Sequence, residues 1–246
     1  TWSFWKVISH NFEDCVIKSW NNFTINSHYG SHEMVNKQYP YQTIDSGLFY
    51  KKVIDNLKKN QNIQFLKDIN HLNTKNSFIF NSIAPNQIHE AKLWQHFKGI
   101  EIETQKNIFD DEIFNLMDFN CDQRNNVHFF YTLPFAKNKA LVETTWLSKM
   151  NDKNLYDYDE QLEKYIKETL KIKNYKIKYE EEGAIPLFYP INKIEQNKIN
   201  IGSAGCMTRT STGYTFLNIQ EHSKYITENI EMIKKAKIYH IGKKYE

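Results

Sequence analysis

The chain has 246 residues, 40% of them hydrophobic, which is enough for one large domain or two small ones with a proper core. Lys and Arg exceed Asp and Glu by only 32 − 29 = +3, and no base-stacking motif of an RNA-binding protein is present, so no nucleic-acid partner is expected. The isolated Cys15, Cys121 and Cys206 indicate neither a disulfide framework nor a zinc site, and no apolar run approaches the roughly 20 residues of a membrane-spanning helix.

Residues 1–92 predict a βα-type unit with a short antiparallel addition. The segment 44–60 carries apolar residues at helical spacing after Asp45 or Ser46, either of which is a good N-cap. Two short apolar segments, 62–69 and 76–83, are typical of strands.

Residues 93–190 change to a strand-rich pattern. An amphipathic helix over 157–172, with Leu162 and Ile166 on one stripe, and a further strand over 175–188 complete this part. The short polar turns between the earlier strands predict an antiparallel meander. The four strand candidates of the meander are 97–105, 112–120, 126–135 and 139–148.

Residues 198–235 predict a strand, a glycine-bearing turn and a long helix, with N-caps in "TSTGY". Bare backbone N–H groups at such a turn can approach a phosphate or the edge of a flavin. The alternative is a tight turn that only needs positive φ, and spacing alone favours it because no G-x-G-x-x-G occurs. The candidate cofactor residues of this turn are Gly202, Ala204, Gly205, Cys206, Met207, Ser211, Thr212 and Gly213.

Histidine spacing gives little support for a metal centre. His28 and His32 are four residues apart, but Gly30 between them indicates a loop and no third ligand is evident. His96 lies between aromatic residues and is more typical of a surface or core histidine. No metal site is expected.

Glu143 is the one acid whose position invites a chemical explanation. Period 2 in the strand 139–148 places it on a face with Leu141, Thr145 and Leu147. An acid on such a face is either an edge-strand glutamate turned to water or a carboxyl group held in an apolar site, and the pattern favours neither.

Six segments together resemble the flavin-dependent lycopene cyclase family, the carotenoid β-cyclases of bacteria. Each segment is weak by itself, but they occur in order and at sensible spacing over nearly the whole chain. The segments are "TWSFW" (1–5), "LWQHFKGIEIET" (93–104), "FNLMDF" (114–119), "FFYTLPFAKNKALVETT" (129–145), "EEEGAIP" (180–186) and "IGSAGCMTRTSTGYTF" (201–216).

The resemblance implies an α/β (α+β) flavoprotein. A partial Rossmann-like FAD domain (1–92 and 191–246) is interrupted by an antiparallel substrate-binding sheet with helices on one face (93–190). It implies reduced FAD, NAD(P)H as reductant, lycopene as substrate, and a cytoplasmic protein in peripheral contact with a membrane. We expect both ends to be truncated, without the first strand and its fingerprint, so that these 246 residues alone would be inactive.

The resemblance also assigns roles to side chains. It makes Glu143 the acid that protonates the polyene, because burial can raise the pKa of a carboxyl group by up to about 3–5 units and keep it protonated. Asp118 and Glu182, or Glu181 in its place, are further candidate acids, although charged residues on strands are usually solvated. The candidate substrate-lining residues are Phe97, Met117, Phe119, Phe130 and Tyr131.

Two other functions remain open at this stage. The same fold could serve an FAD-dependent monooxygenase or isoprenoid reductase, neither of which needs a buried acid on the sheet. The chain could also be an inactive fragment that only binds a polyene.

Overall fold

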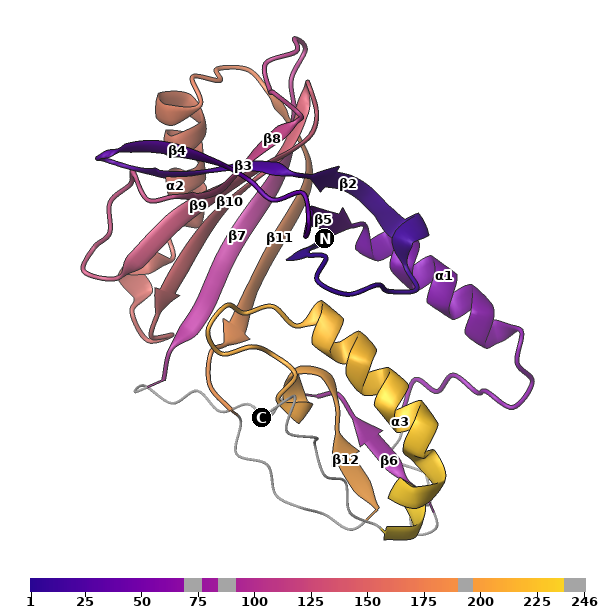
Figure 1. Ribbon diagram of the computed structural model, residues 1–246. Helices are drawn as coiled ribbons and strands as arrows, with labels where there is room; N and C mark the ends of the chain where they lie inside the picture. Colours follow the sequence, from indigo (N-terminus) through magenta and orange to yellow (C-terminus); the bar gives the residue numbers. More distant parts are fainter. Residues whose placement is uncertain (69–76, 84–91, 190–196, 237–246) are drawn as a thin grey trace.

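The computed structural model describes residues 1–68, 77–83, 92–189 and 197–236 (Figure 1). Its largest element is a seven-stranded sheet with the strand order β11-β7-β10-β9-β8-β3-β4. The sheet is antiparallel except where β3 runs parallel to β8. Its strands are β3 (Asn22–Ser27), β4 (Gly30–Val35), β7 (Trp94–Glu103), β8 (Ile113–Asp118), β9 (Val127–Ala136), β10 (Lys139–Ser148) and β11 (Lys176–Pro186).

The predicted antiparallel meander is confirmed for β8, β9 and β10, which are neighbours in chain order, whereas β7 pairs with β10 and not with β8. β11 is the edge strand beside β7. The β3–β4 hairpin was not predicted. It lies in the first 92 residues, which the sequence assigned to the cofactor part, yet it extends the large sheet beyond β8. Its strands are half-buried or exposed and rich in Asn, Ser and Thr, so they lack the apolar alternation from which strands are predicted.

A second, three-stranded sheet is formed by β1 (Trp2–Trp5), β5 (Tyr41–Ile44) and β2 (Val16–Trp20), which follows the 3₁₀ turn Glu13–Cys15. Helix α1 (Ser46–Lys58) follows β5 directly. The predicted N-cap is confirmed, because the Asp45 carboxylate accepts a hydrogen bond of 2.7 Å from the Leu48 N–H.

The third part of the fold is a parallel pair, β6 (Ile79–Asn81) and β12 (Lys198–Asn200), with α3 (Phe216–Ala236) alongside it (Figure 1). A 3₁₀ turn, Gly202–Gly205, connects β12 towards α3. This strand–turn–helix order was predicted. In the described part of the chain, no helix combines the length and apolar character needed to cross a bilayer.

Two local predictions near these elements are wrong. Residues 62–68 form no strand, because they are exposed and have no partner strand; residue 69 lies outside the described residues. Helix α3 begins at Phe216 and not directly after Ser211 and Thr212. Gly213 has φ of +73°, which is incompatible with a helix, and the first helical hydrogen bond runs from the Ile219 N–H to the Thr215 carbonyl at 3.0 Å.

One face of the large sheet is covered by the predicted helix 157–172. It consists of α2 (Tyr158–Lys164), preceded by the 3₁₀ turn Lys153–Leu155 and continued by a π-helical turn, Tyr165–Thr169. We call this side the helix face. Its core contains the following buried side chains: Ile100, Ile102, Phe130 and Val142 from the sheet, and Leu162, Tyr165 and Ile166 from the helix.

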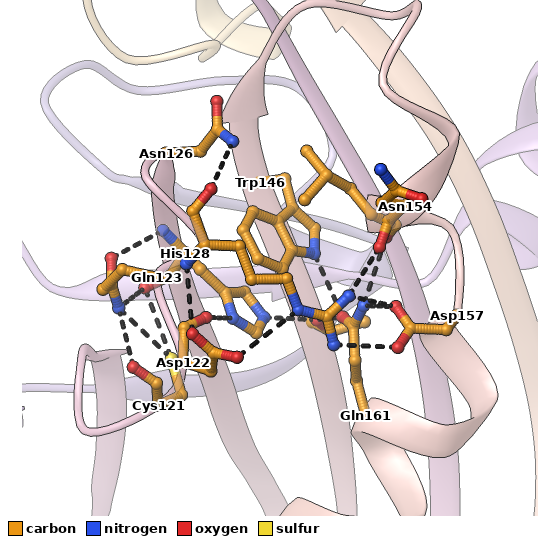
Figure 2. A network of polar contacts seen from close by, with 12 residues as sticks. Cys121, Asp122, Gln123, Asn126, His128, Trp146, Asn154, Asp157 and Gln161 are labelled. Carbon is orange, nitrogen blue, oxygen red and sulfur yellow. Dashed lines mark hydrogen bonds and ion pairs between the residues drawn. The ribbon is translucent and has the colours of Figure 1, made fainter.

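A polar network also attaches this helix to the sheet (Figure 2). The Gln161 Oε1 atom accepts hydrogen bonds from Trp146 Nε1 at 3.0 Å and from the Thr144 hydroxyl at 2.6 Å. Arg124 pairs with both oxygens of Asp157 at 2.8 Å. His128 Nε2 lies 2.8 Å from the Thr144 hydroxyl, and burial lowers the pKa of His128 to about 4, so the ring is neutral at neutral pH.

We predict that Gln161→Ala lowers the free energy of unfolding by about 2–4 kcal/mol, because it leaves the Trp146 N–H and the Thr144 hydroxyl buried without this acceptor. Chemical denaturation at neutral pH measures the change. The control is Glu160→Ala on the exposed side of the same helix, which should change stability by less than about 0.5 kcal/mol. Equal effects of the two substitutions would contradict this role for the network.

Candidate active site

A cavity of about 770 Å³ lies on the other side of the large sheet, which we call the cavity face. The three-stranded sheet contributes Phe4 and Tyr41 to its wall, and the loop before α3 contributes Gly213 and Tyr214. From the large sheet, the lining side chains include Phe97, Tyr131, Leu133, Leu141, Glu143 and Glu181. Parts of the chain that are distant in sequence therefore line this cavity together.

Glu143 is half-buried and lines this cavity. Its strand, β10, lies between β7 and β9 in the interior of the sheet, so the alternative of an edge-strand glutamate does not apply. The Thr145 hydroxyl donates a hydrogen bond of 2.8 Å to Glu143 Oε1. The other oxygen, Oε2, lies over Gly99 of β7, where a Cβ atom would be only 3.3 Å away.

Burial raises the pKa of Glu143 from 4.5 to about 8. The hydrogen bond from Thr145 opposes this rise, and the negative charge of Glu181 adds to it. Glu143 is consequently a protonated carboxylic acid at neutral pH. It can donate a proton to a group in the cavity.

The other predicted acids do not join Glu143. Asp118 is 3% exposed and accepts a hydrogen bond of 2.8 Å from the Tyr165 hydroxyl, which places it on the helix face. Glu182 is exposed at the border of the cavity, and its charge acts on Tyr158 of α2. Glu181, which the sequence could not distinguish from Glu182, is the acid that lies beside Glu143.

The predicted lining residues divide between the two faces. Phe97 and Tyr131 line the cavity, and the Phe97 ring lies against Gly183, where a Cβ atom would come within 2.9 Å of it. Met117 packs in the apolar cluster beneath the cavity, and Phe119 contacts Phe129. Phe130 is on the helix face, where its ring stacks on Tyr165 at 3.9 Å.

Two tyrosines of the cavity wall, Tyr41 and Tyr214, were not found from the sequence. Burial raises the pKa of each phenol, and the neighbouring tyrosines and Glu143 add to this effect at Tyr41. Both side chains are therefore neutral hydroxyl groups. Tyr214 follows Gly213 directly in "TSTGY", which was a signal for its position, whereas nothing in the sequence around Tyr41 points to the cavity.

The predicted glycine turn contributes backbone to the cavity. Gly202 and Gly213 have φ of +59° and +73°, so the turn does need glycine for its conformation. Thr212 and Gly213 line the cavity, and a Cβ atom at Gly213 would lie 2.5 Å from Gln95 Oε1. The remaining candidates lie behind this surface or outside it: Ala204, Gly205 and Met207 are buried, Gly202 and Cys206 are half-buried, and Ser211 is exposed.

No group of three or more His, Cys, Asp or Glu side chains suited to a metal ion occurs within residues 1–68, 77–83, 92–189 and 197–236. His28 and His32 belong to the exposed β3–β4 hairpin region, where His32 pairs with Ile25 in the strand register.

We predict that Glu143→Gln changes the pH dependence of stability. The pKa of this carboxyl group is higher in the folded protein than in the unfolded chain. The free energy of unfolding therefore falls as the pH rises from 4.5 to about 8, because over this range the group is ionised in the unfolded chain but still protonated in the folded protein. The variant should therefore gain stability over the parent across this range, by about 1–3 kcal/mol at about pH 8. Urea unfolding of both proteins at a series of pH values measures this difference.

Glu180→Gln, on the exposed side of β11, is the control and should show no such trend. A difference between parent and Glu143→Gln that does not change with pH would show that Glu143 is ionised in the folded protein at neutral pH.

Comparison with solved structures finds proteins of similar fold at low sequence identity. A geranylgeranyl bacteriochlorophyll reductase-like protein from Thermoplasma acidophilum matches with a TM-score of 0.64 and 11% identity, over 89% of this chain and 64% of its own. A flavin-dependent brominase matches with a TM-score of 0.56 and 8% identity, over 89% and 63%. A myxobacterial FAD-dependent halogenase matches with a TM-score of 0.53 and 9% identity, over 90% and 61%.

These matches show the fold, and the chain spans less than two thirds of the length of each of these structures. No curated protein matches the sequence. The family described as lycopene cyclase protein matches residues 1–242. The mixed α/β fold and this match over nearly all 246 residues agree: the chain belongs to the lycopene cyclase family.

Proposed function

We propose that the protein is a lycopene β-cyclase, which closes the acyclic ends of lycopene into β-rings by acid catalysis. The observation that carries this proposal is the position of Glu143, which lies on an interior strand and lines a cavity with Phe97, Tyr131 and Leu141. Burial there raises its pKa to about 8. Family membership supports a carotenoid substrate.

Proton transfer is the difficult step of this reaction. An isolated carbon–carbon double bond is a very weak base, so its donor must remain protonated near neutral pH and be shielded from water. The raised pKa of Glu143 and its position in the interior of the sheet support it as this donor. Protonation leaves a tertiary carbocation, the neighbouring double bond attacks it to close the ring, and loss of a proton completes an isomerisation without net oxidation.

The cavity wall suits a passing cation. Phe97, Tyr41 and Tyr131 line the same cavity as Glu143, and an aromatic face attracts positive charge by about 0.5–2 kcal/mol. The two tyrosines carry neutral hydroxyl groups and add no competing charge.

We also propose FAD as the cofactor of the whole protein, with NAD(P)H as the reductant. The solved structures of similar fold include FAD-dependent and flavin-dependent enzymes. The backbone at Thr212 and Gly213, together with Ser203, would hold the flavin edge, and the residues present fit this role because no side chain at Gly213 obstructs the cavity. Reduced flavin, when bound, would supply negative charge that stabilises a nearby cation.

A related isoprenoid reductase is the second candidate, favoured by the fold shared with the geranylgeranyl reductase-like protein. A reductase adds hydrogen to a double bond and leaves an acyclic product, and it does not explain a protonated acid over Gly99. For either activity, we propose a cytoplasmic protein in peripheral contact with a membrane, since a long hydrocarbon substrate partitions into lipid.

We predict that the full-length protein converts lycopene into cyclic carotenoids in a lycopene-accumulating cell. Glu143→Gln keeps the shape of the side chain but removes the transferable proton, and should reduce cyclic product by about 100-fold or more. Chromatography of extracted pigments measures the products. Glu180→Gln is the matched control and should behave as the parent.

Saturated or oxygenated acyclic pigments from the parent protein would favour the reductase or a monooxygenase. Near-normal cyclisation by Glu143→Gln would exclude its role as the acid. If the parent protein left lycopene unchanged, both enzyme activities would be excluded and binding of the polyene without conversion would be the remaining function.

A further inference from the structure

We propose that Glu181 is the base that accepts the proton released when the ring is completed, so that the site uses two carboxyl groups on opposite sides of Gly99. This inference rests on the proposed function and extends it to the last step of the reaction. Glu143 lies on β10 and Glu181 lies on β11, and the sequence alone does not show that these two strands flank the same strand, β7.

The strand register places the two acids symmetrically. Gly99 of β7 lies opposite Glu143 of β10 on one side and opposite Glu181 of β11 on the other. Neighbouring strands are about 4.8 Å apart, so the backbones of β10 and β11 are separated by about 10 Å. Side chains at directly paired positions point to the same face of a sheet, and all three residues are therefore on the cavity face.

The side chains of both acids approach the backbone of Gly99 closely. A Cβ atom at this position would lie 3.2 Å from Leu141 Cδ1, 3.3 Å from Glu143 Oε2 and 3.4 Å from Glu181 Cγ. Both acidic side chains therefore lean over the glycine from opposite sides. A hydrocarbon end in the cavity that both side chains line would therefore have the Glu143 carboxyl group towards β10 and the Glu181 carboxyl group towards β11.

The surroundings of the two acids differ in a way that suits a donor and an acceptor. Glu143 receives one hydrogen bond, from Thr145. Glu181 accepts at both oxygens: Oε2 from the Thr1 backbone nitrogen at 2.8 Å and Oε1 from the Thr1 hydroxyl at 3.0 Å. These two hydrogen bonds hold the Glu181 carboxyl group at the wall of the cavity.

The titratable groups around the pair are few. The Thr1 amino group pairs with Glu181. The charge of Glu181 contributes to the raised pKa of Tyr179, and the charge of Glu143 contributes to the raised pKa of Tyr41 and of Tyr131. The Glu181 side chain is 16% exposed, whereas that of its neighbour Glu180 is 55% exposed and pairs with Lys98. Glu181 is therefore partly accessible to solvent, to which it could release a proton.

The complete reaction adds one proton to the substrate and removes one proton from it. The O–H bond of Glu143 breaks, and its proton forms a C–H bond at the terminal double bond of the polyene. The electron pair of the next double bond forms the ring C–C bond. A C–H bond beside the resulting cation then breaks, its electron pair forms the ring double bond, and its proton passes to the Glu181 carboxylate. Solvent removes that proton and returns one to Glu143.

The test compares Glu181→Gln, Glu143→Gln and Glu180→Gln in the full-length protein, with lycopene in heavy water. In Glu181→Gln the donor is intact but the acceptor is missing, so cyclic product should fall by about 30-fold or more. The first proton transfer should still occur and reverse, and recovered lycopene should carry deuterium. Glu143→Gln should form no cyclic product and leave no deuterium in recovered lycopene. Glu180→Gln should form as much cyclic product as the parent.

Normal cyclisation by Glu181→Gln would overturn the proposal, and so would loss of product without deuterium in recovered lycopene. If Glu181→Gln does not fold, as judged from its unfolding transition, Glu181→Asp replaces it. That variant keeps a shortened carboxylate, and the proposal requires labelled lycopene with partly retained product. A parent protein that forms no cyclic carotenoid would refute the proposed function itself, which is a different outcome from a failure confined to Glu181.

Discussion

The removal of one carboxyl group from bulk water is the physical constraint on which the site depends. Glu143 is held in the interior of a seven-stranded sheet, over a glycine, with an aromatic and aliphatic wall around it. The energy cost of ionising a carboxyl group in such a place exceeds the benefit of its single hydrogen bond from Thr145, so the acid keeps its proton. In the proposed function, this protonated acid in a mostly apolar cavity is the proton donor.

Because side chains alternate between the two faces of a strand, adjacent residues of β10 face different surroundings. Thr144 is fully buried on the helix face, where it contacts His128 and Gln161, while the adjacent Glu143 points to the cavity. Hydrogen bonds of Thr144 and Trp146 with His128 and Gln161 hold β9, β10 and α2 together. Figure 2 shows His128, Trp146 and Gln161 in this network. A residue at position 144 consequently cannot share the cavity with Glu143, and it acts on the site only by fixing the strand.

The sequence predicted the parts of the fold in which local pattern and tertiary packing agree. The meander, the helix over 157–172 and the Asp45 cap depend on periodicity and capping within one element. The β3–β4 hairpin was missed because its polar strands derive their position from pairing with β8 and not from burial. Residues 62–68 show the reverse case, in which an apolar pattern forms no strand because no partner is present.

The site was predictable to the same extent. Period 2 correctly grouped Glu143 with Leu141, but the face of the other acids depends on irregular pairing. The register of β8 shifts between Asn115 and Asp118, which turns Asp118 away from the face of Phe114 and Leu116. The choice between Glu181 and Glu182 likewise depends on a shift in β11. Tyr41 and Tyr214 meet only because distant segments close the cavity, and no local pattern records that contact.

The most direct test of this account is infrared difference spectroscopy of the Glu143 carboxyl group, comparing the parent protein with Glu143→Gln as the pH is raised. The account predicts a protonated carboxyl band at neutral pH that disappears with a midpoint at about pH 8 and is absent from the variant. An ionised Glu143 at neutral pH, with a midpoint near the ordinary value of 4.5, would contradict it.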